Sequence, residues 1–204
     1  MIRARRLKKR RDRFIIWPQR DPSVRLLWED EGWFSRFAQP RLGGWGQLTL
    51  QPRMRLPRSP DKALSYYGVK RHDDGQVYLD PCFKRPHSDE TIQFLHGIVL
   101  NATLLRKRVV IVIWDNASWH LARKVKRWIR RYNQQAKALG KPRLIVWALP
   151  KRSPWLNPME PHWLHAKRKV CEPTNADLSP HRLQQPVFAT LNARFIGFLS
   201  QPLL

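Results

Sequence analysis

Apolar positions along the chain form two patterns, short uninterrupted runs and longer stretches with helical spacing. The clearest run is VVIVIW at 109–114, which is rich in β-branched residues and stops abruptly at Asp115 and Asn116. Such a run is typical of a strand that is buried on both faces. We therefore expect a central strand here with Asp115 at its carboxyl end, where open α/β sheets bind ligands. The ordinary alternative is that Asp115 and Asn116 start a turn and cap the next helix.

Further strands are predicted on both sides of this central strand. They are expected at residues 23–28, 47–50, 63–69, 76–80 and 143–149. The first ends in Glu29-Asp30-Glu31, after which Gly32 is expected to break the run. Asp73 and Asp74 precede Gly75, and because an Asp-Gly pair favours a hairpin, we interpret both as turn residues rather than ligands.

Helical spacing predicts helices over residues 88–102, with Ser88 as the N-cap, and over residues 121–138. The buried stripe of the second is expected to consist of Leu121, Val125, Ile129 and Tyr132. A last apolar segment at 187–199 is expected to be a docking helix. The order of elements predicts a mixed α/β sheet flanked by helices, with antiparallel first strands and later strands joined by helical crossovers.

Charge is the most unusual property of the composition. The chain has 204 residues with 39 Lys and Arg against 15 Asp and Glu, a formal net charge of +24. This surplus favours a polyanionic partner, with nucleic acid first and a membrane surface or acidic protein second. The length suits one domain at 21–172, preceded by a basic arm at 1–20 and followed by an extension at 173–204.

The basic arm favours disorder, with a helical tail as the alternative, and in either state its cations can contact phosphates. Lys151 and Arg152 add positive charge near the last predicted strand. The expected DNA-binding residues are Arg3, Arg5, Arg6, Lys8, Lys9, Arg10, Lys151 and Arg152.

Cysteine usage and hydropathy point to an intracellular protein without a membrane partner. Cys82 and Cys171 match no metal-ligand spacing and suggest no disulfide framework, so we expect reduced thiols. The longest apolar run is far shorter than a membrane span, and the apolar stretch at 14–17 is too brief for a signal peptide. We therefore expect a cytoplasmic, nucleoid-associated protein.

Three acids are predicted to converge at one edge of the sheet. Asp30 follows the first strand, Asp115 follows the central strand, and Glu160 opens the helix after the last strand. Three carboxylates without thiols suit Mg²⁺ or Mn²⁺, and two such ions can promote phosphodiester chemistry. The alternative for Glu160 is a capping acid, because Asn157 and Glu160 have nearly the spacing of a capping box.

The sequence around these acids resembles a known family. WDNASWH at 114–120 and LPKRSPWLNPMEPHW at 149–163 are similar to the second and third catalytic motifs of mariner-like bacterial insertion-sequence transposases, the DDE superfamily. The third motif is commonly Leu-Pro-x-x-Ser-Pro-x-Leu-Asn-Pro-x-Glu followed by Trp, and this chain matches each fixed position. LWEDEGW at 27–33 resembles the first motif more weakly. The resemblance covers residues 24–170.

The resemblance implies an RNase H-like fold and a metal-binding triad of Asp30, Asp115 and Glu160. It implies cleavage and strand transfer at transposon ends by a homo-oligomer on DNA. It also implies supporting roles for Asn116 and His120, and Asn157 matches a fixed position of the third motif.

The chain departs from the family in three ways. Forty-four residues lie between Asp115 and Glu160, more than in mariner-type proteins, and Pro161 replaces a basic residue. Only 29 residues precede Asp30, where the family carries helix-turn-helix domains. We therefore expect a catalytic half that relies on a separate helix-turn-helix polypeptide, encoded by an upstream frame, for end recognition.

Two other functions compete with this hypothesis. A catalytically inactive, truncated remnant would keep the basic surface and bind DNA non-specifically, although the three acids count against it. Another RNase H-like nuclease, acting on RNA hybrids or junctions, is disfavoured by the third motif.

Overall fold

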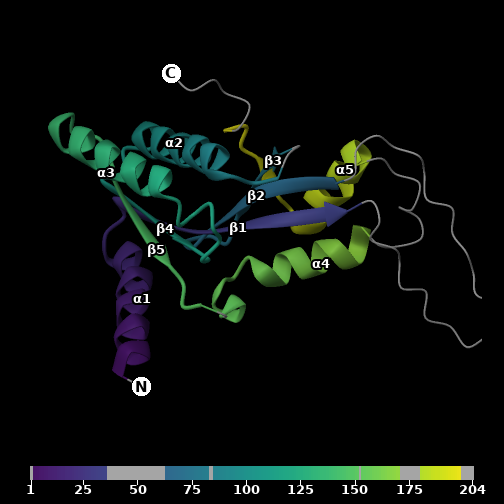
Figure 1. The fold of residues 1–204 in the computed structure, drawn as a ribbon, viewed down its shortest axis with the longest axis horizontal. Coiled ribbons are helices and arrows are strands. Elements are labelled where there is room, and N and C mark those ends of the chain that lie inside the picture. The colour runs from purple at the N-terminus through teal and green to yellow at the C-terminus, as the bar shows by residue number, and fades with distance from the viewer. Residues whose placement is uncertain (1, 36–62, 83–84, 152, 171–179, 199–204) are drawn as a thin grey trace, which may run out of the picture.

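The computed structural model describes residues 2–35, 63–82, 85–151, 153–170 and 180–198 (Figure 1). Its centre is a six-stranded sheet with the order β5-β4-β1-β2-β3-β6. The strands are β1 (Val24–Ser35), β2 (Ala63–Arg71), β3 (Val77–Cys82), β4 (Val109–Trp114), β5 (Arg143–Ala148) and β6 (Arg194–Phe195). The predicted central strand is confirmed as β4, and all six of its residues are buried.

Helices cover both faces of the sheet (Figure 1). One face carries α2 (Ser88–Leu104) and α3 (Arg123–Ala138), whose apolar side chains share a core with Leu27, Val110 and Val112. The other face carries α1 (Ile2–Arg20), α4 (Glu160–Val170) and α5 (Pro180–Leu191), which share a core with Leu26 and Ile111. The mixed α/β architecture expected from the order of elements is therefore confirmed.

The register of the strands places the acids. β1 runs parallel to β4, with Val24 opposite Val109 and Trp28 opposite Ile113. Continuing this register by two residues brings Asp30 level with Asp115. The expected parallel pairing of the first and central strands is thus correct.

β1 is longer than expected, and the acids lie within it. We expected the strand to end at Trp28 and Gly32 to break it, but β1 continues to Ser35 because its second half pairs with β2, as in Glu29 opposite Val69. Side chains alternate along a strand. Glu29 and Glu31 therefore face α2 and α3, whereas Asp30 faces α4.

Trp163 of α4 packs against the backbone of two strands. A Cβ atom on Gly32 would lie 2.6 Å from the indole, and one on Gly68 of β2 would also lie 2.6 Å from it. The indole stacks on Tyr66 at a centroid distance of 6.5 Å and is 2 % exposed. The two glycines thus form a notch that seats α4 on the sheet.

Three expectations about the helices are wrong. The basic arm is helical rather than disordered, because its apolar end is fastened to the sheet, with Phe14 against Trp147 at 5.7 Å. The N-cap of α2 is His87 instead of Ser88, since the His87 ring accepts a hydrogen bond from the amide of Asp89. Leu121 is exposed, because α3 begins only at Arg123.

The C-terminal segment also differs from the expected helix at 187–199. α5 ends at Leu191, where Asn192 adopts a positive φ of 45°, and Arg194–Phe195 then pair with β3. By contrast, Asp73 and Asp74 do lie in the turn between β2 and β3, as predicted. The strand expected at 47–50 falls outside the described residues.

Over the described residues, no helix combines the length and hydropathy that a membrane span requires.

The glycine notch generates a prediction about stability. Gly68→Ala should lower the free energy of unfolding by about 1–3 kcal/mol, because the new methyl overlaps Cζ2 of Trp163. The cost should be smaller in a Trp163→Phe background, which lacks that part of the indole. Urea denaturation of the two single variants and the double variant measures the coupling. Equal costs of Gly68→Ala in both backgrounds would show that the notch does not set the packing.

Candidate active site

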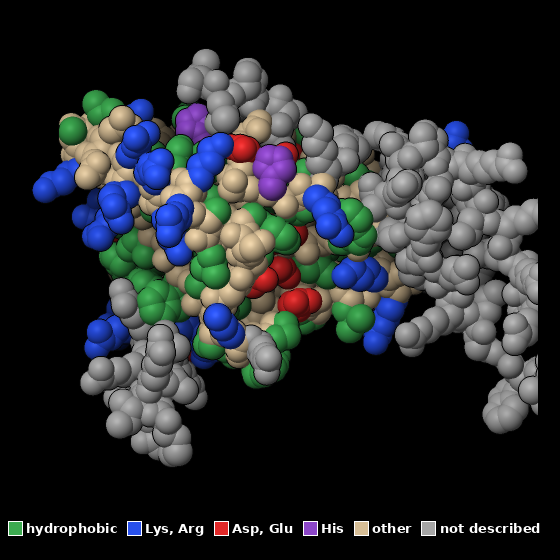
Figure 2. Space-filling view, in the orientation of Figure 1, with side chains coloured by type: hydrophobic (Ala, Val, Ile, Leu, Met, Phe, Trp, Pro, Cys, Tyr) green, Lys and Arg blue, Asp and Glu red, His purple; other side chains and the backbone are tan. Residues whose placement is uncertain are grey.

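The three predicted acids line one cavity. Asp30, Asp115 and Glu160 all border a space of about 360 Å³ at the carboxyl ends of β4 and β5. Lys151 lies on its wall together with Asn116, Asn157 and the turn before α4. Figure 2 shows acidic side chains on a face whose other charged side chains are mostly lysines and arginines. The expected convergence of the three acids is thus observed, whereas their catalytic role stays a prediction.

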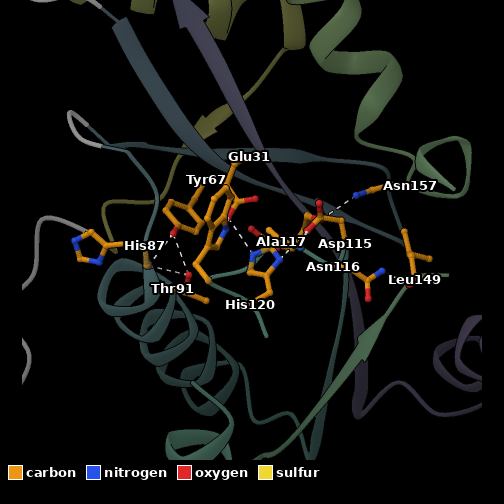
Figure 3. Close-up of polar contacts among 12 residues, drawn as sticks. Glu31, Tyr67, His87, Thr91, Asp115, Asn116, Ala117, His120, Leu149 and Asn157 are labelled. Atoms are coloured by element: carbon orange, nitrogen blue, oxygen red, sulfur yellow. Dashed lines mark hydrogen bonds and ion pairs between the residues drawn. The ribbon is translucent and has the colours of Figure 1, made fainter. Parts of the chain in front are cut away.

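Two asparagines fasten the loops that carry the acids. The side-chain amide of Asn157 donates to the backbone carbonyl of Glu29 at 2.9 Å, and its oxygen accepts from the amide of Met159 at 3.1 Å. Asn116 donates to the carbonyl of Leu149 at 2.5 Å (Figure 3). Asn157 therefore ties the start of α4 to β1, and Asn116 ties the end of β4 to the end of β5.

Glu160 is the first residue of α4. Its amide donates to the carbonyl of Asn157 at 3.2 Å, so the turn at 157–160 that was predicted as a cap leads directly into the helix. The capping interpretation and the placement of Glu160 in the cavity are therefore compatible.

Asp30 is electrostatically strained by burial and by its acidic neighbours. Burial, followed by the charges of Glu160, Glu31 and Asp115, raises the pKa of Asp30 to about 8. A carboxylate with a raised pKa beside two further carboxylates is stabilised by a divalent cation. The donor set, three carboxylates with oxygen atoms only, fits a hard ion such as Mg²⁺ or Mn²⁺.

His120 lies between Asp115 and Glu31 of β1 and contacts both (Figure 3). Its Nδ1 is 2.9 Å from Asp115 Oδ1, and its Nε2 is 3.0 Å from Glu31 Oε1 and 3.3 Å from Glu29 Oε2. The ring stacks on Trp114 at 4.3 Å. His120 thus sits in a buried position with carboxylates on both nitrogen atoms.

These carboxylates keep His120 protonated. Burial alone would lower the pKa of His120, but the charge of Glu29 and the hydrogen bonds with Asp115 and Glu31 raise the pKa to about 11. Burial alone would raise the pKa of Asp115, yet its hydrogen bonds to His120 and to the amide of Ala117 hold that pKa below its ordinary value. Asp115 is therefore ionised and oriented by an imidazolium.

Glu29 is the least satisfied acid of the group. It is 1 % exposed, and neither carboxylate oxygen accepts a hydrogen bond among the described residues. Burial, followed by the charge of Glu31, raises the pKa of Glu29 well above its ordinary value. Glu31, in contrast, accepts a hydrogen bond from the indole of Trp119 at 2.6 Å.

The roles of Glu29 and Glu31 were missed by the sequence analysis, which placed all three acids at a strand end. The signal was present in the spacing, because acids two apart on a strand point to the same face. Among the described residues, Glu29, Glu31 and His120 also form a group whose ligand atoms lie within 4.8 Å of one another. The His120 imidazolium supplies a positive charge to this group.

The predicted DNA-binding cations are only partly described. Lys151 lies on the cavity wall, as expected for a residue beside the site. The six cations of the arm lie on α1, whose first turns are described only by their backbone, and Arg152 is outside the described residues. Their contact with DNA stays a prediction.

A family model and several solved structures are similar to this chain. Residues 80–179 match a family model described as DDE superfamily endonuclease. This match includes Asp115 and Glu160, whereas Asp30 lies before it. No match was found among the curated proteins.

Solved structures with the same fold include complexes of Mos1. A Mos1 transposase paired-end complex with the left transposon end has a TM-score of 0.58 at 19% identity, over 96% of this chain and 57% of that chain. A pre-cleavage Mos1 transpososome has a TM-score of 0.59 at 18% identity, over 95% and 56%. A Mos1 mariner paired end complex with Mn has a TM-score of 0.50 at 18% identity, over 92% and 59%.

At these identities the structures show a common fold, which is RNase H-like as expected. The chain spans less than two thirds of the length of each of these three Mos1 chains.

The raised pKa of Glu29 predicts how the stability of the protein depends on pH. Since the folded state holds this proton more tightly than the unfolded state, the contribution of Glu29 to stability falls as pH rises above its ordinary pKa. Asp30 and His120, whose pKa values are also raised, act in the same direction. Glu29→Gln should reduce the fall of the free energy of unfolding with rising pH, and it should stabilise the protein near pH 8.5 by on the order of 1 kcal/mol.

Urea denaturation in EDTA at about pH 5.5 and about pH 8.5 measures this effect. Asp89→Asn, at an exposed acid in the first turn of α2, is the control and should keep the slope of the wild type. A steeper slope for Glu29→Gln than for the wild type would contradict the prediction.

Proposed function

We propose that this chain, whose residues 80–179 match a family model described as DDE superfamily endonuclease, is the catalytic domain of a transposase. Its proposed reactions are metal-dependent cleavage and strand transfer of DNA at the ends of an insertion sequence. The observation that carries the proposal is the cavity that Asp30, Asp115 and Glu160 share. The family match, together with a fold shared with Mos1 transposase complexes, supports the same reaction class.

In this proposal the three carboxylates hold one or two Mg²⁺ or Mn²⁺ ions. Such ions activate an attacking oxygen and stabilise the leaving oxygen of a phosphodiester. Asp30, whose pKa is raised by burial and then by the neighbouring carboxylates, would lose its proton on binding such an ion, because metal ligands are deprotonated. His120 fixes one oxygen of Asp115 through the Nδ1 hydrogen bond and leaves the other available to the ion.

The loops around the cavity provide the remaining functions. Asn157 holds the turn before Glu160 against β1, so that the acid of α4 keeps its distance from Asp30. Lys151 on the cavity wall is positioned to contact a DNA phosphate. These residues are assigned to positioning and substrate binding.

DNA is the proposed partner because of the charge of the chain and the distribution of its cations. The net charge is +24, and α3 carries an exposed basic face. The exposed cations of α3 are Arg123, Lys124, Lys126, Arg127, Arg130, Arg131 and Lys137. Of these described cations, Lys124 forms an ion pair, with Asp89. A homo-oligomer on the nucleoid DNA is proposed as the working form.

An inactive remnant that only binds DNA is the competing function, and a nicking assay separates the two. Incubation with supercoiled DNA and Mn²⁺ should produce nicked circles. Asp115→Asn and Glu160→Gln should each lower the rate by at least about 100-fold, more than the loss of a residue that only supports a metal ligand.

Asp73→Asn is the matched control, because Asp73 lies in the exposed turn between β2 and β3. It should nick DNA at the rate of the wild type. If the wild type leaves the plasmid intact while still binding it, the inactive remnant is the correct interpretation. If the triad variants nick as fast as the wild type, the activity comes from another site or from a contaminant.

The basic face of α3 predicts salt-sensitive DNA binding. The apparent affinity should fall steeply with salt concentration, because each phosphate contact releases counterions. Replacing Arg127, Arg130 and Arg131 by Gln should lower the slope of log K against log salt by up to about 3, one unit for each lost contact. Fluorescence anisotropy with a labelled duplex measures the slope.

A second triple variant controls for the change in net charge. Arg106, Arg143 and Arg194 are exposed cations outside α3: Arg106 precedes β4, Arg143 is the first residue of β5, and Arg194 lies in β6. Their replacement by Gln should change the slope by less than half as much. Equal changes for the two triple variants would mean that the affinity reflects overall charge and not a surface on α3.

A further inference from the structure

An exposed tryptophan stands at the rim of the acidic cavity. Trp155 is 75 % exposed, the highest value among the described aromatic residues. It lies at the centre of the short helix η1 (Pro154–Leu156). Ser153 and Pro154 before it and Asn157 after it line the cavity, so the backbone that carries Trp155 lies at the cavity rim.

The turn that carries Trp155 is held in place. The amide of Leu156 donates to the carbonyl of Ser153 at 3.1 Å, and the amide of Asn157 donates to that of Pro154 at 2.8 Å. Asn157 in turn is fastened to β1 by its side chain. The backbone that carries the indole is therefore held by hydrogen bonds, and the exposed indole itself does not pack in the core.

A large exposed indole on an ordered support suits stacking. No ring contact with Trp155 is found among the described residues, and Pro154 directly before it lines the cavity that the acids share. Every DNA base has a π-face, and stacking of an unpaired base on an aromatic side chain is tolerant of sequence. A strand whose phosphate reaches the acids would bring its neighbouring bases to this rim.

We propose that Trp155 stacks on an unpaired base next to the phosphate that reacts in the cavity. This inference rests on the proposed function, since it requires DNA as the substrate. Trp155 would thereby select DNA that is opened or frayed at the reacting position. Lys151 on the same wall would neutralise the adjacent phosphate.

The test uses the full chain in EDTA, so that DNA is bound but not cleaved. Two duplexes of the same sequence carry 2-aminopurine, one at a paired position and one as a single unpaired base. Wild-type protein should quench the unpaired probe and bind that duplex more tightly. Trp155→Ala should weaken binding of the unpaired duplex roughly tenfold and remove the quenching, with less than about twofold change for the paired duplex.

Trp155→Phe should retain part of the preference, because a smaller ring still stacks. Phe195→Ala, at an exposed aromatic on β6, is the control and should behave as the wild type. The melting temperature of each variant establishes that it is folded.

The outcomes separate this inference from the proposed function. If Trp155→Ala still prefers and quenches the unpaired probe, the stacking inference is overturned while DNA binding stands. If Trp155→Ala weakens binding to both duplexes equally, Trp155 contacts DNA without stacking on an unpaired base, and the inference is likewise overturned. If the wild type binds neither duplex, the proposed function itself fails.

Discussion

The parallel register between β1 and β4 is the constraint on which the site depends. It sets Trp28 opposite Ile113, and from there Asp30 comes level with Asp115. A shift by one residue would turn Asp30 toward α2 and bring Glu29 or Glu31 into the cavity instead. The core opposes such a shift, because Leu26 and Leu27 belong to apolar clusters on opposite faces of the sheet. The packing of neutral side chains therefore decides which acid faces the cavity.

The same alternation divides the negative charge between two environments. On the cavity side, Asp30 is left beside Asp115 and Glu160, and this repulsion favours a divalent ion. On the other side, Glu31 faces the His120 imidazolium. Asp115 connects the two sides, since it lines the cavity and hydrogen-bonds to His120. On the side away from the cavity the acids are thus neutralised by the imidazolium of His120, whereas the acids on the cavity side are arranged to bind a divalent ion.

The parts of the site that could be predicted from sequence are those controlled by local pattern. The apolar run before Asp115 determines both its strand and its position at the strand end, and Asn157 begins the turn before Glu160 as its side chain suggests. The length of β1 could not be predicted, because it depends on pairing with β2, which no local signal reveals. The partnership of His120 with Glu31 followed from that extension and was missed for the same reason. The helix α1 was missed because its contact between Phe14 and Trp147 joins distant parts of the chain.

The position of Glu160 depends on a packing contact outside the cavity. Glu160 and Trp163 are three residues apart on α4 and so lie on the same side of the helix. The indole is seated in the notch formed by Gly32 and Gly68. Gly32 lies on β1, the strand of Asp30, and Gly68 lies on β2 directly opposite Asp30. Because Asn157 fastens the preceding turn to β1, the first turn of α4 is held at both ends. The exposed carboxylate of Glu160 can in this way keep a defined place opposite Asp30, although its side chain makes no hydrogen bond with another described residue.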